Sequence, residues 1–250
     1  MDRLIFTSLS SQKFIEHRTQ QIANEIANIS TAGFKREFTA AIQTYRYDGD
    51  GYKSRYVPVV TPGARVDLDP GPMMNTGRAL DVALRGNQLF AVISKSGEIA
   101  YTRRGDLSVD ATGTLVVGSG EQIASDAGAP ITIPELTEIK VGPDGTVLTK
   151  QLGGEAVIFQ PLARIQVAEA DPSKLVLRTD GLYESSDRQP FAAAQTPAVS
   201  SGTLEGSNTN LFSSMVDMIS MSRRYEMAVK VLKQASDLAQ RSQSLARLNQ

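Results

Sequence analysis

Glycine and proline are confined to the middle of this chain of 250 residues. The first glycine is Gly33, the last is Gly206, and all 11 prolines lie between them. Because these two residue types interrupt regular helices, both ends of the chain are compatible with long helices, whereas the middle is divided into short segments. The distribution therefore predicts two helical ends around a turn-rich middle.

The N-terminal end carries apolar residues at helical spacing. Ile5, Leu9, Ile15, Ile22 and Ile26 follow one another at intervals of roughly three, four and seven, with polar residues between them. This spacing predicts an amphipathic helix over residues 3–29. The helix is expected to end near Gly33, because glycine adopts left-handed backbone geometry with little strain.

The C-terminal end shows a seven-residue apolar repeat. Its members are Leu211, Met218, Tyr225, Leu232 and Ala239, accompanied by Met215, Ile219, Ala228, Val229 and Ala235. The repeat predicts one helix from an N-cap at Ser207 or Asn208 to about Arg247. Its narrow apolar stripe favours a second helix as packing partner, either in an intramolecular helical hairpin or in a neighbouring subunit.

The middle of the chain has the pattern of a β domain. Residues 45–77 are rich in turn formers and indicate an extended linker with short strands. From Ala79 onward, short apolar runs such as QLFAVIS and TLVVG alternate with Gly, Pro, Asp and Asn, which is typical of a sandwich or irregular barrel. VDATGTL at 109–115 and VGPDGTV at 141–147 resemble each other, and two similar hairpins explain them better than a repeat architecture.

These patterns together predict an α+β fold. Long N- and C-terminal helices are expected to pack together as a coiled-coil-like stem, beside a central irregular β domain. The expected domains are an N-terminal helix at 1–36, an extended linker at 37–78, the β domain at 79–200 and a C-terminal helix at 201–250.

Motifs for chemistry are missing from the sequence. The chain has no cysteine and one histidine, His17, which excludes the common zinc sites, disulfides and thiol nucleophiles. Asp48-Gly49-Asp50-Gly51 begins like a calcium loop, but the positions that should follow are occupied by Tyr52, Lys53 and Val59. No nucleophile elbow, Walker loop or dinucleotide motif occurs. We therefore expect no catalytic, metal or cofactor-binding residues, no cofactor and no enzyme.

Composition limits the partners further. The net charge is −1 and no segment is basic enough for nucleic acid. No run of about 18 apolar residues is present to span a membrane. The opening MDRLIFTSLSSQKFIEH lacks the features of a cleaved secretory signal, so we expect any export to use another route. Two apolar stripes without an evident core of their own point to assembly with other proteins rather than to a small-molecule substrate.

Three blocks of the sequence resemble the flagellar axial family, the rod and hook proteins of the bacterial flagellum. IANEIANISTAGFK at 22–35 is similar to the family's N-terminal signature, although Ala32 stands where a proline is usual. RALDVALRGNQLFAV and the segment beginning YTRRGDLSVD resemble the shared β domain. LEGSNTNLFSSMVDMISMSRRYEMAVKVL at 204–232 resembles the C-terminal signature.

The resemblance implies a structural subunit of the basal-body rod. The length and the opening MDRLIFTSLS look most like the proximal-rod members, with a distal-rod subunit or a rod-associated assembly factor as alternatives; a hydrolase using carboxylates of the β domain is a third class that no motif supports. The implied partners are other rod proteins, copies of the same chain and the flagellar type III export apparatus, and the implied location is the periplasmic rod.

The same resemblance implies that the terminal helices form the subunit interfaces. The expected interface residues of the first helix are Ile5, Leu9, Ile15, Ile22, Asn24, Ile26, Asn28, Gly33 and Phe34. Those of the second helix are Asn208, Leu211, Met215, Met218, Ile219, Tyr225, Val229 and Leu232.

Overall fold

The computed structural model describes residues 2–38, 42–47, 55–60, 65–151 and 158–248. Backbone contacts divide the chain into two compact units. The helical unit consists of Met1–Ala27, Thr39–Gly63 and Asn210–Gln250, and the β unit consists of Asn28–Phe38 and Ala64–Thr209. The acidic turn at 48–51 lies outside the described residues.

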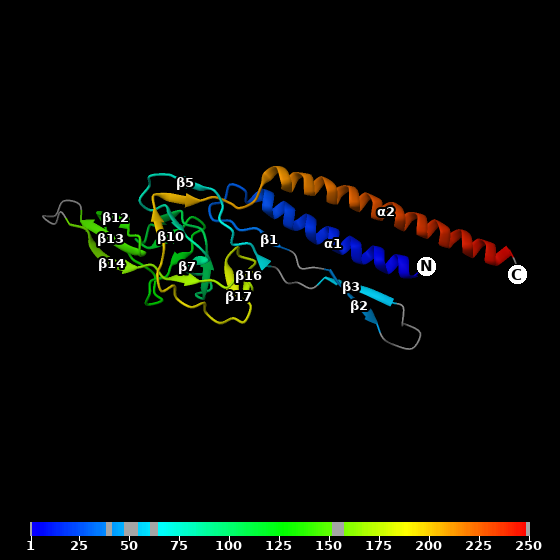
Figure 1. Cartoon of the computed structure of the whole chain (residues 1–250), viewed down its shortest axis with the longest axis horizontal. Helices are drawn as coiled ribbons and strands as arrows, with labels where there is room; N and C mark the ends of the chain where they lie inside the picture. Colours follow the sequence, from blue (N-terminus) through cyan, green and yellow to red (C-terminus); the bar gives the residue numbers. More distant parts are fainter. Residues whose placement is uncertain (1, 39–41, 48–54, 61–64, 152–157, 249–250) are drawn as a thin grey trace. The chain divides into compact units, whose positions relative to one another are not determined.

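The helical unit contains two helices and one hairpin. Helix α1 spans Asp2–Ala27 and helix α2 spans Leu211–Leu248, and the two lie side by side in opposite directions (Figure 1). Strands β2 (Ile42–Tyr47) and β3 (Arg55–Val60) pair antiparallel, and β3 contacts α1. Both helices fall inside the two segments that lack glycine and proline.

The expected fold class is wrong in one respect, because the two helices do not form a coiled-coil-like stem. α1 has 26 residues and α2 has 38, so α1 is about 39 Å long and cannot accompany the roughly 57 Å of α2. The contact between them also includes buried polar side chains, Glu25 and Ser214, where a coiled coil places apolar knobs. The described part of the chain is mainly β between one shorter and one longer helix.

The β unit is built from short antiparallel strands. Their bounds are β1 Glu37–Phe38, β4 Arg65–Val66, β5 Met73–Asn75, β6 Val82–Leu84, β7 Gln88–Ile93, β8 Ile99–Thr102, β9 Leu107–Val109, β10 Leu115–Val117, β11 Gln122–Ile123, β12 Thr137–Val141, β13 Thr146–Gln151, β14 Gln160–Arg164, β15 Val167–Glu169, β16 Leu175–Leu177, β17 Tyr183–Ser185, β18 Val199–Ser201 and β19 Thr203–Glu205. The largest sheet has the order β16-β17-β8-β7-β11-β10-β9, with β15 also paired to β7.

Strand β7 of this sheet is buried on both faces. Along a strand, successive side chains point to opposite faces. In β7, Phe90 and Val92 join one apolar cluster with residues such as Leu107 and Leu115. Leu89 and Ala91 join a second cluster with Tyr101, Tyr183 and others. The unbroken apolar run QLFAVI is therefore the sequence of a strand between two cores.

Six hairpins in the described β unit share one loop geometry. In each, a residue i donates its N–H to the carbonyl of residue i+4, and a glycine at i+3 with positive φ donates back to the carbonyl of residue i. The glycines are Gly97, Gly113, Gly120, Gly128, Gly145 and Gly181. This is the three-residue loop in which glycine takes the left-handed position. The hairpin predictions at 109–115 and 141–147 are confirmed, with Val109 opposite Leu115 and Val141 opposite Val147.

Candidate assembly surface

Helix α2 begins at an asparagine cap. The side chain of Asn210 accepts hydrogen bonds from the backbone N–H groups of Phe212 and Ser213 at 3.0 and 3.2 Å. This satisfies two of the amides that a helix start leaves unpaired. The predicted cap at Ser207 or Asn208 is therefore wrong by two or three residues, because Asn208 is used in other contacts described below.

One face of α2 is covered, and its first turns contact α1 through polar groups. Ser214 donates a hydrogen bond to the buried carboxylate of Glu25 at 3.0 Å. Arg18 lies 3.5 Å from Asp217 and 3.7 Å from Glu25. The described residues of α2 that are buried or half-buried are Leu211, Ser214, Asp217, Met218, Ser220, Met221, Ala228, Leu232 and Ala235. Except for Ser220, they fall on one side of the helix.

The opposite face of α2 exposes large apolar side chains. Phe212 is 79% exposed, Val216 65%, Ile219 55% and Met227 58%. Their spacing of four, three and eight residues places them on one side of the helix, which we call the outward stripe. Most single exposed apolar residues need no explanation, but a row of four on one helix face is typical of a surface that another molecule covers.

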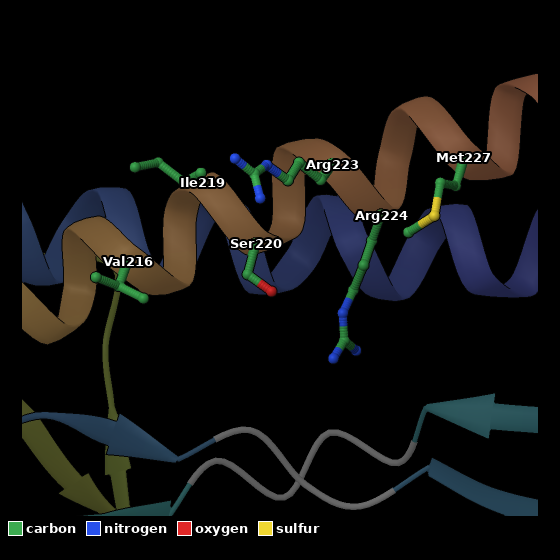
Figure 2. Close-up of a pocket in the computed structure, with 6 residues that line it drawn as sticks. All are labelled: Val216, Ile219, Ser220, Arg223, Arg224 and Met227. Carbon is green, nitrogen blue, oxygen red and sulfur yellow. The ribbon is translucent and has the colours of Figure 1, made fainter.

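The outward stripe borders a groove with a basic lining. The groove has a volume of about 320 Å³, and it is lined by Val216, Ile219, Ser220, Arg223, Arg224 and Met227 (Figure 2). Apolar side chains and two arginines therefore line the same groove on α2. This combination suits a partner that presents an apolar side chain beside a carboxylate or a backbone carbonyl.

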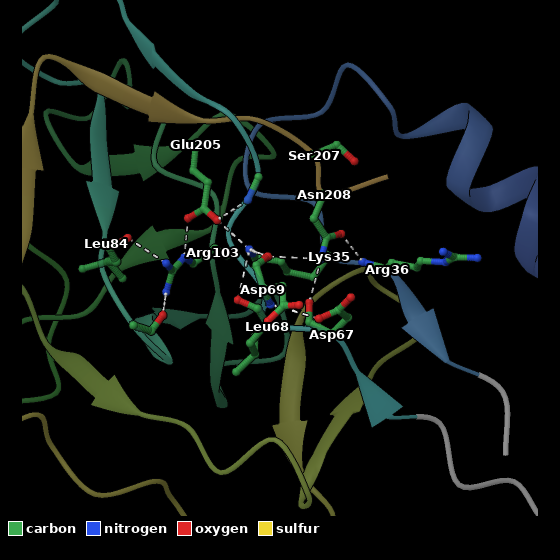
Figure 3. Close-up of polar contacts among 12 residues, drawn as sticks. Lys35, Arg36, Asp67, Leu68, Asp69, Leu84, Arg103, Glu205, Ser207 and Asn208 are labelled. Carbon is green, nitrogen blue, oxygen red and sulfur yellow. Dashed lines mark hydrogen bonds and ion pairs between the residues drawn. The ribbon is translucent and has the colours of Figure 1, made fainter. Parts of the chain in front are cut away.

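In the β unit, a buried ion cluster joins the segment that follows α1 to the segment that precedes α2. Glu205 is 2% exposed, and its carboxylate lies 2.5 Å from Nζ of Lys35 and 2.6 Å from Nε of Arg103 (Figure 3). Arg103 also donates to the backbone carbonyls of Leu84, Gly86 and Gln88. Lys35 donates to the carbonyl of Asp69 at 2.7 Å.

Opposing effects act on the ionisation of this cluster. Burial lowers the pKa of Lys35 below its ordinary 10.5, although Glu205 acts in the other direction. Burial alone would raise the pKa of Glu205, but Arg103 and Lys35 outweigh it and hold that pKa below the ordinary 4.5. The carboxylate is therefore charged at neutral pH, between two cations.

Backbone and amide groups tie the same two segments together. Gly33 has φ of +68°, and its N–H donates to the carbonyl of Glu205 at 2.7 Å. A Cβ at this position would lie 2.3 Å from the carbonyl oxygen of Arg103, so only glycine fits. The side chain of Asn208 accepts from the N–H of Arg36 and donates to the carbonyls of Asp67 and Asp69.

The structure places the expected interface residues in different environments. Ile15, Ile22 and Gly33 are buried, Ile26, Asn28, Phe34 and Asn208 are half-buried, and Asn24 is exposed. In α2, Leu211, Met218 and Leu232 are half-buried, whereas Met215, Ile219, Tyr225 and Val229 are exposed. Ile5 and Leu9 belong to α1, but their side chains lie outside the described part. Their role in contacts between subunits stays a prediction.

Sequence reasoning missed two groups of residues. Phe212, Val216 and Met227 complete the outward stripe, and their spacing from Ile219 was a usable signal that the seven-residue repeat concealed. Lys35, Arg103 and Glu205 meet only in the folded chain, so local spacing carried no signal for them. Within the described residues, no helix is long and apolar enough to cross a membrane, and no group of three or more His, Asp or Glu side chains is arranged to hold a metal.

Two segments of the sequence match models of known protein families. Residues 83–149 match the family model described as the flagellar hook protein FlgE/F/G D1 domain. Residues 200–245, which include most of α2, match the flagellar basal body rod FlgEFG protein C-terminal family. The first match lies within the β unit, and the second includes the outward stripe of α2.

Relatives match over nearly the whole chain. The flagellar basal-body rod protein FlgF of Escherichia coli is 36% identical over 98% of both chains. FlgF of Salmonella typhimurium is 33% identical over 93% of both. The basal-body rod protein FlgG of Bacillus subtilis is 27% identical over 99% of this chain and all of its own, a weaker match than the two FlgF proteins. The chain therefore belongs to the flagellar basal-body rod protein family, as a structural, non-enzymatic subunit of the FlgF kind.

Proposed function

We propose that this rod subunit packs against neighbouring axial subunits through the outward stripe and the basic groove of α2. The observation that carries the proposal is the exposure of Phe212, Val216, Ile219 and Met227 on one helix face. Burying one such side chain contributes roughly 1.5 to 3 kcal/mol before ordering costs are subtracted. Four of them would contribute roughly 6 to 12 kcal/mol to each contact between subunits before the costs of association are subtracted.

Two helix faces would then have separate tasks. The covered face, which includes Leu211, Met218 and Leu232, serves packing within the chain, and the outward stripe serves packing between chains. The partners are other rod subunits and copies of this chain. In this arrangement α2 transmits torque from one subunit to the next, and the rod that it helps to build is needed for swimming.

The finer points of location follow from the family resemblance. FlgF-type similarity supports a place in the proximal rod, with the FlgG-type distal position as the alternative. Assembly there requires export through the flagellar type III apparatus into the periplasm, without a cleaved signal. Detecting the chain in the periplasm of cells with a working export apparatus, and only in the cytoplasm of cells without one, tests this part separately.

The absence of cysteine from the sequence allows a direct test of the surface. Ile219→Cys and Met227→Cys each introduce a single thiol on the stripe, and Lys95→Cys introduces one at an exposed position of the β unit. In intact basal bodies, we expect the thiols at 219 and 227 to be shielded from a maleimide reagent. Equal labelling of all three in assembled rods and in monomers would contradict the proposal.

A functional test uses the same positions. Ile219→Asp should abolish swimming, because it places a charge in the buried contact, and Lys95→Asp, at an exposed position of the β unit, should leave swimming intact. The purified Ile219→Asp chain should unfold at the same denaturant concentration as the unchanged protein. Normal swimming of the Ile219→Asp strain would exclude the stripe as an assembly surface.

A further inference from the structure

We propose that the segments 28–38, 65–76 and 202–208 of the β unit, here called the collar, open and close as one unit, with Glu205 as its lock. α1 runs into the collar at Asn28, and the collar leads to α2 after Asn208. A closed collar therefore fixes where both helix-bearing ends leave the β unit. This device is separate from the assembly surface of α2.

The collar is held mainly by polar contacts. Strand β5 is exposed at all three positions, and its partner β19 is buried only at Glu205. The described apolar residues that anchor the collar in the core are Val66 and Leu68, which join the second apolar cluster. Regions with few buried apolar contacts open at lower free energy than the core that they adjoin. With so few buried apolar residues, the collar is expected to open at a lower free energy than the core.

One carboxylate connects the three segments of the collar. Glu205 binds Lys35 of the first segment, accepts from the N–H of Gly71 of the second at 3.1 Å and lies on the third itself. It also binds Arg103, whose guanidinium is fixed by three carbonyls of the core. Glu205 is thus the point where all three segments and the core meet (Figure 3).

The charges make this lock depend on Glu205 in particular. Two cations share one carboxylate, and the other hydrogen-bond acceptors of Lys35 and Arg103 in the described part of the chain are neutral backbone carbonyls. Removing the carboxylate leaves two buried cations facing each other, which opening to water relieves. Removing Lys35 instead leaves a matched pair of Arg103 and Glu205. The cluster therefore responds far more to loss of Glu205 than to loss of Lys35.

Hydrogen exchange of the full-length chain with Glu205→Gln tests the proposal. The informative amides are Asp67, Thr76 and Gly206, which bond to backbone carbonyls within the collar and not to the Glu205 side chain. The reference amides are Ala91 and Val117 of the core sheet. We expect the three collar amides to exchange at least tenfold faster by one common factor, while the two reference amides stay unchanged.

Two results would overturn this inference. Acceleration confined to Gly71 would mean that Glu205 makes only a local contact. Equal acceleration of Ala91 and Val117 would mean that the collar does not open separately from the core. As a control, Glu138→Gln removes an exposed carboxylate that pairs with Lys140 and Lys150, and should change none of these rates.

A second variant tests the role of charge. Adding Lys35→Met to Glu205→Gln removes one of the two uncompensated cations, and should bring the exchange of the collar amides back to within a few-fold of the unchanged protein. If the double variant exchanges as fast as Glu205→Gln alone, excess positive charge is not what opens the collar, and the lock as described here is refuted.

Discussion

The two units of this chain differ in how far they bury their large apolar side chains. In the β unit, Phe90, Leu107 and Leu115 have no exposed surface, and strand β7, which carries Phe90, contributes to an apolar cluster on each of its faces. In the helical unit, α2 leaves Phe212, Val216 and Ile219 more than half exposed. The apolar clusters of the β unit are covered within that unit, whereas the outward stripe of α2 is the surface that we propose a neighbouring subunit covers. A subunit of a rod needs both: a stable body and a surface that is satisfied only in the assembly.

The largest effect should come from the core of the β unit. Phe90→Ala removes a fully buried ring and should lower the free energy of unfolding by about 3 to 5 kcal/mol. Met227→Ala, on the exposed stripe, should change it by less than about 0.5 kcal/mol. Denaturant titration of both purified variants measures the contrast. Similar losses in the two variants would mean that the stripe is already packed in the monomer.

A smaller loss is expected at Gly33. Gly33→Ala combines an unfavourable positive φ with a Cβ that meets backbone atoms of Arg103, and should cost about 2 to 3 kcal/mol. Gly86→Ala is the matched control, because Gly86 also has positive φ but open space around the new Cβ, and should cost about 1 kcal/mol. Thermal unfolding of the two variants isolates the steric part. Equal melting temperatures would contradict the close approach at Gly33.

The ion cluster gives the β unit a dependence on acid. The pKa of Glu205 is lowered in the folded chain, so its contribution to stability is fully present above the ordinary value of 4.5 and is lost as the pH falls through the folded pKa. The difference in unfolding free energy between the unchanged protein and Glu205→Gln should therefore be constant near neutral pH and should shrink below pH 4.5. A difference that does not change with pH would show that the charge of Glu205 is unimportant.

The smallest effect should be a gain. Arg188 has φ of +57° in an exposed turn, where its N–H donates to the carbonyl of Ser185 at 2.9 Å. Arg188→Gly should relieve the strain of this conformation and stabilise the β unit by roughly 0.5 to 1 kcal/mol. Thermal unfolding measures it, and a lower melting temperature would contradict the expected relief.

The sequence predicted local structure well and long-range contacts poorly. The segments without glycine and proline became α1 and α2, and the run QLFAVI became β7. These features depend on residues close together in the chain, where backbone preference and apolar period act directly. The domain limits drawn at residues 36, 78 and 200 stay predictions.

The coiled-coil-like stem was wrong because a heptad repeat predicts where apolar residues lie, not which partner covers them. Glu25 shows the difference, since a charged residue outside the apolar repeat became one of the buried contacts between α1 and α2. The ion cluster could not be predicted from the sequence for a similar reason. Arg103 and Glu205 were recognised as parts of family-like blocks, but their contact depends on the complete fold.

The short sequence separation within the six hairpins leads us to expect that they close early in folding. Each hairpin pairs residues six positions apart, such as Ile93 with Ile99, so each can close within microseconds. The collar instead pairs Glu37 with Val66 and Met73 with Glu205, and contacts between such distant residues form slowly. In a chain growing from its N-terminus, we expect the hairpins to form before residue 205 is available to complete the pairing of β5 with β19. The last step of folding then coincides with the arrival of the segment that leads into α2.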